Sequence, residues 1–462
     1  MRTMAEREDA GRQHAPAVQA LRELVRLPTV SRRPPEEADP EPFEAFGEAL
    51  ARLFPLLHEH LELETVATYG VLARWPARPG GEALDPVVLM AHLDVVPVDD
   101  PEAWTHDPFG AELVDTDDGP AVWGRGTLDD KGELVGICAA VEELLAAGFS
   151  PARDVWLSFG PTEEVSGPAA AEAVAVLRER GVRPWFVLDE GGAVAHEAFP
   201  GVSAPVAVVG VTEKGMTALE LRVTGPGGHA STPSAGSPVV RLARAIDRLD
   251  RSPMPSRLAE PVAELLGRLA RRAALPLRPV LAAAGSVGAL SPAVARLLVL
   301  AGPEGAAMTR TTFAITTLRG SAALNVVAPT ATAGVDVRVM PGDTVADVVE
   351  HVRRAVDDDA VDVRVLEAGE ASPVSPRDDA FGLVERVVSE VFPDAVPAPY
   401  VMMAGTDSRH FTTLCPRVYR FAPLRMTKQQ RQSIHGVDEH VLVEAFLDGV
   451  RWYRRLLEEL PG

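Results

Sequence analysis

Hydrophobic positions in the first half of the chain follow two periods. Short apolar runs, at 87–91, 155–159 (interrupted only by Ser158) and 185–188, predict buried strands, because a strand covered on both faces carries apolar side chains at nearly every position. Apolar residues spaced three and four apart, at 15–26 and 169–180, predict amphipathic helices between these strands. This alternation is typical of an α/β fold, with a sheet flanked by helices.

The pattern changes from about residue 206 onward, where apolar and polar residues alternate strictly in several predicted strands. Strand, loop, helix and further strands in this order indicate a separate α+β domain inserted in the first one. We expect the inserted domain to span 213–341, so that the first domain is built from 1–212 and 342–462. Within the insertion, 251–305 is predicted to be an additional helical segment.

Composition narrows the classes of function. The chain has 45 Lys and Arg residues against 66 Asp and Glu residues, and its net charge of −21 argues against nucleic acid and anionic membrane surfaces as partners. The most apolar stretch, 280–302, is interrupted by glycine, proline and arginine, so we expect packed helices there and no membrane span. Only three lysines occur, and two of them lie in short motifs, Lys131 in DDKG and Lys214 in TEKG. In a chain that otherwise uses arginine, this favours a requirement for a compact ammonium at these positions, with chance as the alternative.

The cysteine content and the first residues bear on the compartment. Cys138 and Cys415 cannot build a disulfide framework, and the charged first dozen residues show no apolar signal segment. We therefore expect a cytoplasmic protein.

Histidines and carboxylates follow the ends of the predicted strands or begin the predicted helices. They are His92, Asp94, Asp129, Asp130, Glu163, Glu164, Asp189, Glu190 and His435. Because ligands bind at the carboxyl ends of strands in an open α/β sheet, we expect these side chains to lie together. Imidazoles and carboxylates are the ligand types of a zinc pair, which activates a water for attack on a carbonyl.

Ordinary structural roles compete with this interpretation. Asp129 or Asp130 can serve as a helix N-cap, and the adjacent Glu163 and Glu164 are common in solvated turns. Glu190 and Asp130 also stand next to the candidate ligands Asp189 and Asp129. In each pair the sequence leaves open which of the two neighbouring acids is the ligand.

The motifs, taken together and in order, resemble the M20 family of metallopeptidases and amidohydrolases. They are HLDVVPV, GRGTLDDKG, PTEEVSG, VLDEGG, GGHAST, NVVAP, AGTDSRHF and IHGVDE. The resemblance extends from about residue 15 to 457 and is nearest to the carboxypeptidase S-like branch, which includes N-acyl-amino-acid hydrolases. It implies a di-zinc catalytic domain with a mixed sheet flanked by helices, and an inserted α+β lid that also serves for dimerisation.

The resemblance also assigns metal ligands. It implies two Zn²⁺ ions per chain, with Co²⁺ or Mn²⁺ as alternatives, and with Asp129 bridging the two. One zinc would be held by His92 and Asp189, and the other by Glu164 and His435.

Roles in catalysis and substrate binding follow from the same resemblance. Glu163 would be the base that activates the water, Asp94 would orient His92, and His229 of the lid would stabilise the oxyanion, in many relatives across a dimer interface. The matching substrate-binding positions are Asn325, Arg338, Gly405, Thr406 and Asp407. Ala404 departs from the family pattern, which often has a second glycine there.

The implied activity is hydrolysis of an amide bond next to a free carboxylate, in small peptides or N-acyl amino acids, by a protein that forms a homodimer through its lid. One alternative is a deacylase of an acetylated or succinylated biosynthetic intermediate, and another is a catalytically inactive binding protein on the same fold. The apolar insertion at 251–305 is expected to shape an acyl pocket or a subunit interface, or else to be ordinary lid core.

Overall fold

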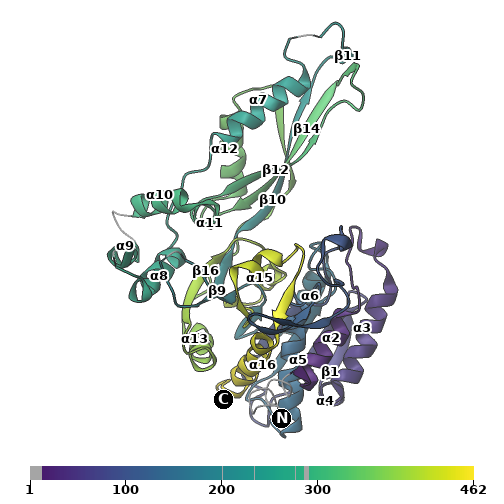
Figure 1. The fold of residues 1–462 in the computed structure, drawn as a ribbon, viewed down its shortest axis with the longest axis vertical. Coiled ribbons are helices and arrows are strands. Elements are labelled where there is room, and N and C mark those ends of the chain that lie inside the picture. Colours follow the sequence, from purple (N-terminus) through teal and green to yellow (C-terminus); the bar gives the residue numbers. More distant parts are fainter. Residues whose placement is uncertain (1–12, 200, 234, 276, 286–290) are drawn as a thin grey trace.

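The computed structural model describes residues 13–199, 201–233, 235–275, 277–285 and 291–462. A broad body of helices and strands contains the C-terminus, and an elongated lid rises from it (Figure 1). Among the described residues, no helix combines the length and the apolar character needed to cross a membrane.

The broad body contains a ten-stranded mixed sheet with the order β1-β2-β6-β3-β7-β17-β9-β8-β18, and β16 pairs with β9 outside this path. Strand β3 lies parallel to both β6 and β7, while β1, β2 and β6 are antiparallel. The strands are β1 (Glu62–Val66), β2 (Gly70–Trp75), β3 (Val87–His92), β6 (Val155–Gly160), β7 (Phe186–Asp189), β8 (Ala193–Ala195), β9 (Val206–Glu213), β16 (Val396–Met402), β17 (Val418–Arg420) and β18 (Arg425–Met426). The predicted mixed sheet is confirmed.

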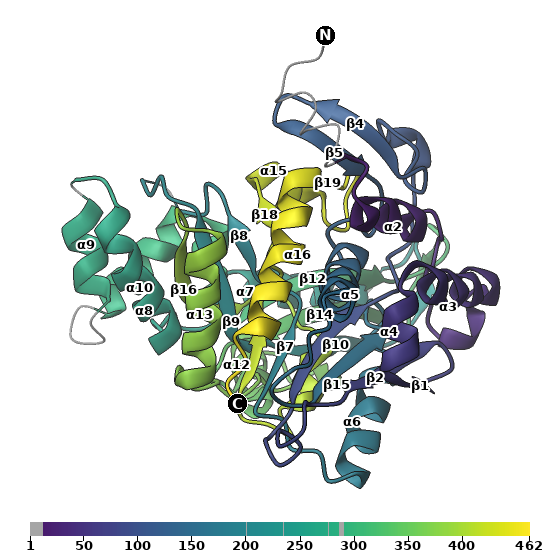
Figure 2. The ribbon, with the colours of Figure 1, turned by 90° about the horizontal axis from the view of Figure 1, so that it is seen from below.

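Helices cover both faces of this sheet, which explains why β3 is apolar at every position from Val87 to Ala91. Val87 and Leu89 face a core shared with α5 and α16, while Val88 and Met90 face a core shared with α6 and α14. Figure 2 shows α5 and α16 lying side by side across the sheet. The helices of the first face are α2 (Pro16–Val25), α3 (Pro40–Leu53), α4 (Pro55–His60), α5 (Lys131–Ala146), α13 (Asp379–Val391) and α16 (Val443–Glu458), and those of the second are α6 (Ala169–Glu179) and α14 (Ser408–Phe411).

A small three-stranded sheet joins two distant parts of the chain. It consists of β4 (Glu112–Thr116), β5 (Gly119–Trp123) and β19 (His440–Leu442), with β5 in the centre. Since β5 precedes Asp129 and β19 follows His435, this pairing holds the two segments beside each other. Helix α15 (Lys428–Ser433) leads into the second segment.

The lid is built on an antiparallel sheet of order β12-β14-β10-β15, and its central strands β10 and β14 alternate between buried and half-exposed positions as predicted. Its elements are β10 (Gly215–Thr224), β11 (Gly228–His229), α7 (Pro238–Asp250), β12 (Thr312–Arg319), β13 (Val326–Val327), β14 (Thr330–Val339), α12 (Val345–Val356) and β15 (Val361–Glu367). Strand β15 pairs with β10, and α12 packs into the lid core, so the lid sheet continues beyond the expected boundary at residue 341. Periodicity shows that a segment is a strand, but not which sheet accepts its hydrogen bonds.

The segment 251–305 is helical as predicted, but it does not form the lid core. It contains α8 (Glu260–Leu269), the short 3₁₀ helix η3 (Ala270–Arg272), α9 (Leu277–Ala284), α10 (Ser291–Ala301) and α11 (Pro303–Ala307). Val262 and Leu266 of α8 pack with Val401, and Leu265 packs with Ala398, both on β16 of the large sheet. The insertion therefore packs against β16, at the edge of the catalytic sheet, and we call it the buttress.

Leu89 in the centre of β3 is fully buried, so Leu89→Ala is expected to lower the free energy of unfolding by about 2–5 kcal/mol through lost burial and a residual cavity. Denaturant titration measures this change. The matched control is Leu300→Ala, whose side chain is 83% exposed and which is expected to stay within about 0.5 kcal/mol of the wild type. Equal changes in the free energy of unfolding for the two substitutions would contradict the burial of β3 in the core.

Candidate metal centre

Asp129 lies between two histidines that are far apart in the sequence. His92 ends β3, Asp129 directly precedes the N-terminal turn of α5, and His435 lies in the loop between α15 and β19. The Nε2 atom of His92 is 2.9 Å from Oδ1 of Asp129, and Nε2 of His435 is 3.0 Å from Oδ2 of Asp129 and 3.0 Å from Oε2 of Glu164. One carboxylate thus offers one oxygen to each histidine, which is the arrangement of a bridging ligand.

The orientation of His92 is fixed from behind the ring. Its Nδ1 atom is 2.9 Å from the backbone oxygen of Asp94 and 3.5 Å from the Asp94 carboxylate. A proton on Nδ1 that is donated to this carbonyl leaves the Nε2 lone pair directed at the cluster, as metal ligation requires. Both the backbone oxygen of Asp94 and, at the longer distance, its carboxylate thus face Nδ1 of His92, in keeping with the orienting role predicted for Asp94.

The Asp94 carboxylate has a second task. Its two oxygens accept hydrogen bonds from the backbone nitrogens of Glu163 and Glu164, each at 3.1 Å. Since Asp94 follows β3 and the two glutamates follow β6, these bonds hold the neighbouring strand ends in register. They position both glutamates toward His92.

Glu190, and not Asp189, brings its side chain into the cluster. Ligand atoms of His92, Glu163 and Glu190 lie within 4.8 Å of one another, as do those of His92, Asp129 and Glu164. Asp189 is the last residue of β7, and its Oδ2 accepts a hydrogen bond from the backbone nitrogen of Ser408 at 2.8 Å. Successive side chains of an extended chain point to opposite sides, so only one of the two acids can face the cluster.

The electrostatics of the cluster favour a cation. Burial, with the nearby Asp129, raises the pKa of Glu190 well above its usual range, and burial likewise raises the pKa of Glu163, to which Asp407 and Asp129 add. Burial also tends to raise the pKa of Asp129, but hydrogen bonds with His435 and His92 bring it below the usual range. The acids outnumber the histidines, so the described residues leave negative charge uncompensated.

Glu164 provides a direct test of whether the donor set fits a metal. Its Oε2 contacts His435, while its Oε1 is buried and has no hydrogen-bond partner among the described residues. An unpartnered buried carboxylate oxygen is costly, and a divalent cation satisfies it. Imidazole nitrogens with carboxylate oxygens also match the ligand preference of zinc.

The loop after β16 carries the predicted substrate-side residues. Thr406 donates its backbone N–H to the buried Glu213 at 3.2 Å, and burial, with nearby Asp189 and Asp94, raises the pKa of Asp407 to about 7. A Cβ atom on Gly405 would lie 2.9 Å from Cε of Met216 at the base of the lid. The loop therefore links the cluster to the lid.

Arg338 lies on the lid strand next to this loop. Its cross-strand partner is Met216, and such partners share a face of the sheet, so Arg338 is on the face that reaches Gly405. Its Nε atom donates to Asp336 at 2.9 Å. This places a guanidinium at the base of the lid, beside the substrate-side loop.

His229 and Asn325 lie together, but away from the cluster. Strand β11, which contains His229, pairs with β13, and the backbone N–H of Ala230 donates to the carbonyl of Asn325. Figure 1 shows β11 at the end of the lid opposite to α5 and α15, the helices that flank Asp129 and His435. Nδ1 of His229 accepts from the backbone nitrogen of Ser231 at 3.1 Å, and the exposed ring can donate from Nε2.

The model of peptidase family M20/M25/M40 matches residues 88–459. The chain belongs to the M20 family. As an M20-type peptidase or amidohydrolase, it is an enzyme that acts on C–N amide bonds. The predicted family and enzyme class are confirmed.

Similar proteins include members of the carboxypeptidase S-like branch. The chain is 35% identical over 428 residues to a probable carboxypeptidase S-like 2 of Dictyostelium discoideum, with 92% of this chain and 80% of that protein covered. It is 34% identical over 447 residues to the human N-fatty-acyl-amino acid synthase/hydrolase PM20D1, with 95% and 87% covered. The fold matches the M20 family metallo-carboxypeptidase Sso-CP2 from Sulfolobus solfataricus with a TM-score of 0.69 at 17% identity, covering 96% and 98% of the two chains.

A buried ion pair in this M20 chain was not predicted from the sequence. Oε2 of Glu439 accepts from Arg125 at 2.7 Å, and Oε1 accepts the backbone N–H groups of Gly126 and Leu128 at 3.0 and 2.8 Å. Arg125 also donates to the carbonyl of Gly436 at 2.7 Å. The pair holds the loop that contains Asp129 against the loop that contains His435. In the sequence, the only indication of this pair is that Arg125 and Glu439 both lie within the motifs quoted above.

Glu439→Ala is expected to lower the free energy of unfolding by about 3–5 kcal/mol, because it leaves the buried Arg125 guanidinium without its carboxylate. Thermal and denaturant unfolding measure the loss. The control is Glu367→Ala, which removes an exposed ion pair with Arg33 and is expected to change stability by at most about 1 kcal/mol. If Glu439→Ala lowers the free energy of unfolding no more than the control does, the buried Arg125–Glu439 pair does not stabilise the fold as predicted.

Proposed function

We propose that the chain is a zinc-dependent hydrolase that cleaves the amide bond next to a free carboxylate in N-acyl amino acids. The observation that carries this proposal is the position of Asp129 between His92 and His435, with Glu163 beside the cluster. The human relative named as an N-fatty-acyl-amino acid synthase/hydrolase supports the substrate class. Small peptides are the second candidate, favoured by the relatives named carboxypeptidase S and carboxypeptidase S-like.

Two zinc ions per chain are proposed, with Co²⁺ or Mn²⁺ as alternatives. Asp129 would bridge the pair, His92 would hold one ion, and Glu164 with His435 would hold the other. For the remaining ligand of the first ion we propose Glu190 in place of Asp189, because Glu190 lies within ligand distance of His92.

When bound, such a metal pair polarises the substrate carbonyl and lowers the pKa of a water. Glu163 takes the proton of the attacking water and passes it to the leaving nitrogen, as a general base that then acts as a general acid. The hydrogen bond from its backbone nitrogen to Asp94 holds it in place for both transfers. Burial raises the pKa of Glu163 well above its usual range, which suits a group that first accepts the proton and then donates it.

Substrate binding is assigned to both domains. Arg338 would bind the free carboxylate, since a guanidinium forms two parallel hydrogen bonds with it, and the loop at Gly405, Thr406 and Asp407 would position the amide. His229 and Asn325 lie too far along the lid to serve their own cluster in this arrangement (Figure 1), so we propose that they complete the site of a second copy. The exposed apolar residues of lid strand β12 support a homodimer at this surface.

The alternative substrate and the cellular location are proposed from the sequence. A deacylase of an acetylated or succinylated intermediate would use the same cluster, and hydrolysis rates on N-acyl amino acids, dipeptides and such intermediates separate these substrates. A cytoplasmic location is supported by two free cysteines, Cys138 and Cys415, which are both buried.

Glu190→Gln is expected to lower the zinc content from two ions per chain to about one, because an amide is a much weaker zinc ligand than a carboxylate. The matched control is Asp189→Asn, in which the side-chain oxygen still accepts from Ser408 and both ions are retained. Elemental analysis of metal-replete protein measures both. The opposite result, with zinc lost only in Asp189→Asn, would restore the ligand assigned from the sequence.

Glu163→Gln is expected to lower kcat for amide hydrolysis by about 10²–10⁴-fold while both zinc ions stay bound, because glutamine cannot take the proton. Steady-state kinetics and elemental analysis on the same samples check the two halves of this expectation. Glu172→Gln, an exposed change on α6, serves as the control. Unchanged turnover in Glu163→Gln would refute the mechanism.

A further inference from the structure

The buttress contains a long stretch without acidic residues. Between Glu264 and Glu304 the sequence has no Asp or Glu, although these two residue types make up 66 of the 462 residues of the chain. The same stretch contains no lysine or histidine, and its positive charges are those of Arg268, Arg271, Arg272, Arg278 and Arg296. The net charge of −21 for the whole chain therefore conceals one basic segment.

Four of these arginines face solvent without a partner. Arg268 is half-buried, and it donates to Glu264 at 2.6 Å and to the carbonyl of Pro397 at 3.0 Å. The other four are exposed, and none of them forms an ion pair or a side-chain hydrogen bond with a residue that the structure describes. Their charge is therefore free to attract an anionic surface.

Leucines are exposed in the same stretch. Leu275 and Leu300 are 81% and 83% exposed, and Leu297 is 56% exposed. In α10, Arg296, Leu297 and Leu300 share one side of the helix, since residues three and four apart lie on the same face. Single exposed leucines are common on proteins, but these three, together with the four unpaired arginines, make the surface of the buttress apolar and basic at once.

Helices α9 and α10 form the outer layer of the buttress. Leu281 of α9 and Val294 of α10 pack with Val262 of α8 in one apolar cluster, and α8 in turn packs on β16. Both views of the fold show α9 and α10 next to each other at the margin of the molecule (Figures 1 and 2). Their exposed side chains are therefore available to a partner outside the chain.

We propose that this surface of the buttress docks on a lipid bilayer that contains anionic phospholipids. In the docked state, the leucines enter the boundary between headgroups and acyl chains, and the arginines lie near the lipid phosphates. The net charge of the whole chain argues against such a partner only if the charge is spread evenly. Because the acids lie elsewhere, an anionic surface attracts the buttress and repels the rest of the protein, which selects the orientation of docking.

Other partners suit these residues less well. A symmetric contact with a second copy would bring the arginines of both chains together, where their charges repel. Nucleic acid attracts arginines, but its phosphate backbone gives exposed leucines nothing to pack against. Anionic lipid satisfies both residue types. Docking does not depend on the reaction proposed above, so it is tested without a substrate.

The test measures cosedimentation of the full-length, metal-replete protein with two kinds of vesicles. One kind contains phosphatidylcholine alone, and the other contains phosphatidylcholine and phosphatidylglycerol in equal amounts. We expect the protein to bind the second kind only. Raising the salt concentration to about 0.5 M is expected to weaken this binding, because salt screens the attraction between arginines and lipid phosphates.

Two double substitutions separate the contribution of charge from that of apolar contact. Arg271→Gln/Arg272→Gln is expected to lower the partition coefficient about 25-fold, since each basic residue near an anionic surface contributes about fivefold. Leu297→Gln/Leu300→Gln is expected to lower it about tenfold or more, because the apolar area that enters the bilayer is lost. All four side chains are exposed, so unchanged melting temperatures are expected to accompany the loss of binding.

Matched controls change the same residue types on the lid. Arg353→Gln/Arg354→Gln on α12 alters the net charge by the same amount, and Val365→Gln/Leu366→Gln on β15 removes two exposed apolar side chains. Both controls are expected to bind vesicles as the wild type does.

Three results would overturn the proposal. The first is a wild type that does not bind the phosphatidylglycerol vesicles, and the second is a loss of binding in the lid controls as large as in the buttress variants. The third is a different occupant: a dimer that Leu297→Gln/Leu300→Gln alone dissociates in analytical ultracentrifugation, or an oligonucleotide whose binding depends on the arginines and not on the leucines, in either case without binding to vesicles.

Discussion

The accumulation of carboxylates at neighbouring strand ends is the constraint on which the rest of the structure depends. Acids that follow β6 and β7 meet the aspartate before α5 in a partly buried space, where like charges repel and desolvation is costly. Protonation of the acids or nearby positive charge relieves this repulsion, and the described residues supply positive charge in part through His92 and His435. The geometry of the strands, the small sheet and the Arg125–Glu439 pair can therefore be understood as the means of holding these acids together.

Much of this organisation could be predicted from the sequence. Apolar runs that end in acids and histidines predicted the strands and the edge of the sheet where the ligands meet. A strand that is buried on both faces is visible in the sequence as an apolar run, and the ligands at its end are visible as the polar residues that follow. The retained lysines were also informative. Lys131 is buried and donates to the carbonyls of Leu24 and Leu27 at the end of α2, a task that suits three compact donors better than a planar guanidinium.

The remaining features depend on information that residue order does not contain. Whether Asp189 or Glu190 faces the cluster depends on where β7 ends, and one residue reverses the answer. The main-chain contact from Asp94 to His92 depends on a local turn, and the addition of β15 to the lid depends on which edge is free. The buttress formed by α8 depends on contacts with β16, about 130 residues later in the chain, which no pattern within either segment predicts.

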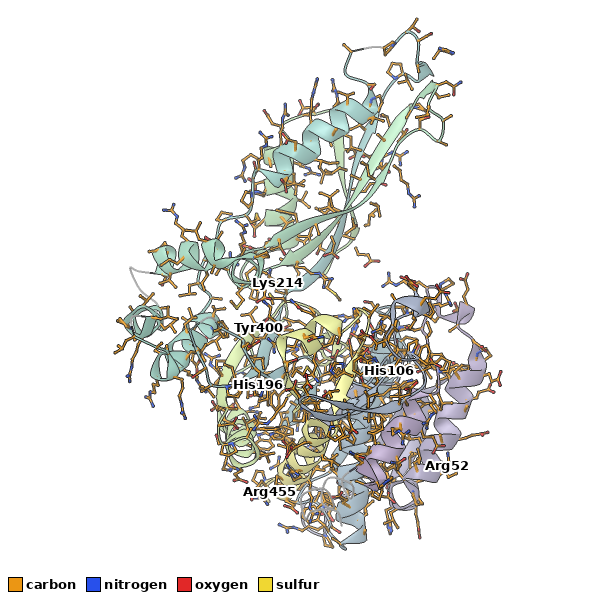
Figure 3. All side chains as sticks on the ribbon, in the orientation of Figure 1. Arg52, His106, His196, Lys214, Tyr400 and Arg455 are labelled. Carbon is orange, nitrogen blue, oxygen red and sulfur yellow. The ribbon has the colours of Figure 1, made fainter. Side chains whose placement is uncertain are left out.

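The junction between the two sheets has a mechanical consequence. Strand β9 ends at Glu213 and β10 begins at Gly215, so Lys214 alone separates the catalytic sheet from the lid, and its ammonium is held by the carbonyl of Arg310 at 2.8 Å (Figure 3). Glu213 accepts the backbone N–H of Thr406 and the guanidinium of Arg420. A rotation of the lid about this joint would displace Glu213, and through the hydrogen bond to the backbone N–H of Thr406 it would displace the substrate-side loop as well. The position of the loop that faces the substrate is thus tied to the orientation of the lid through a single residue, Glu213.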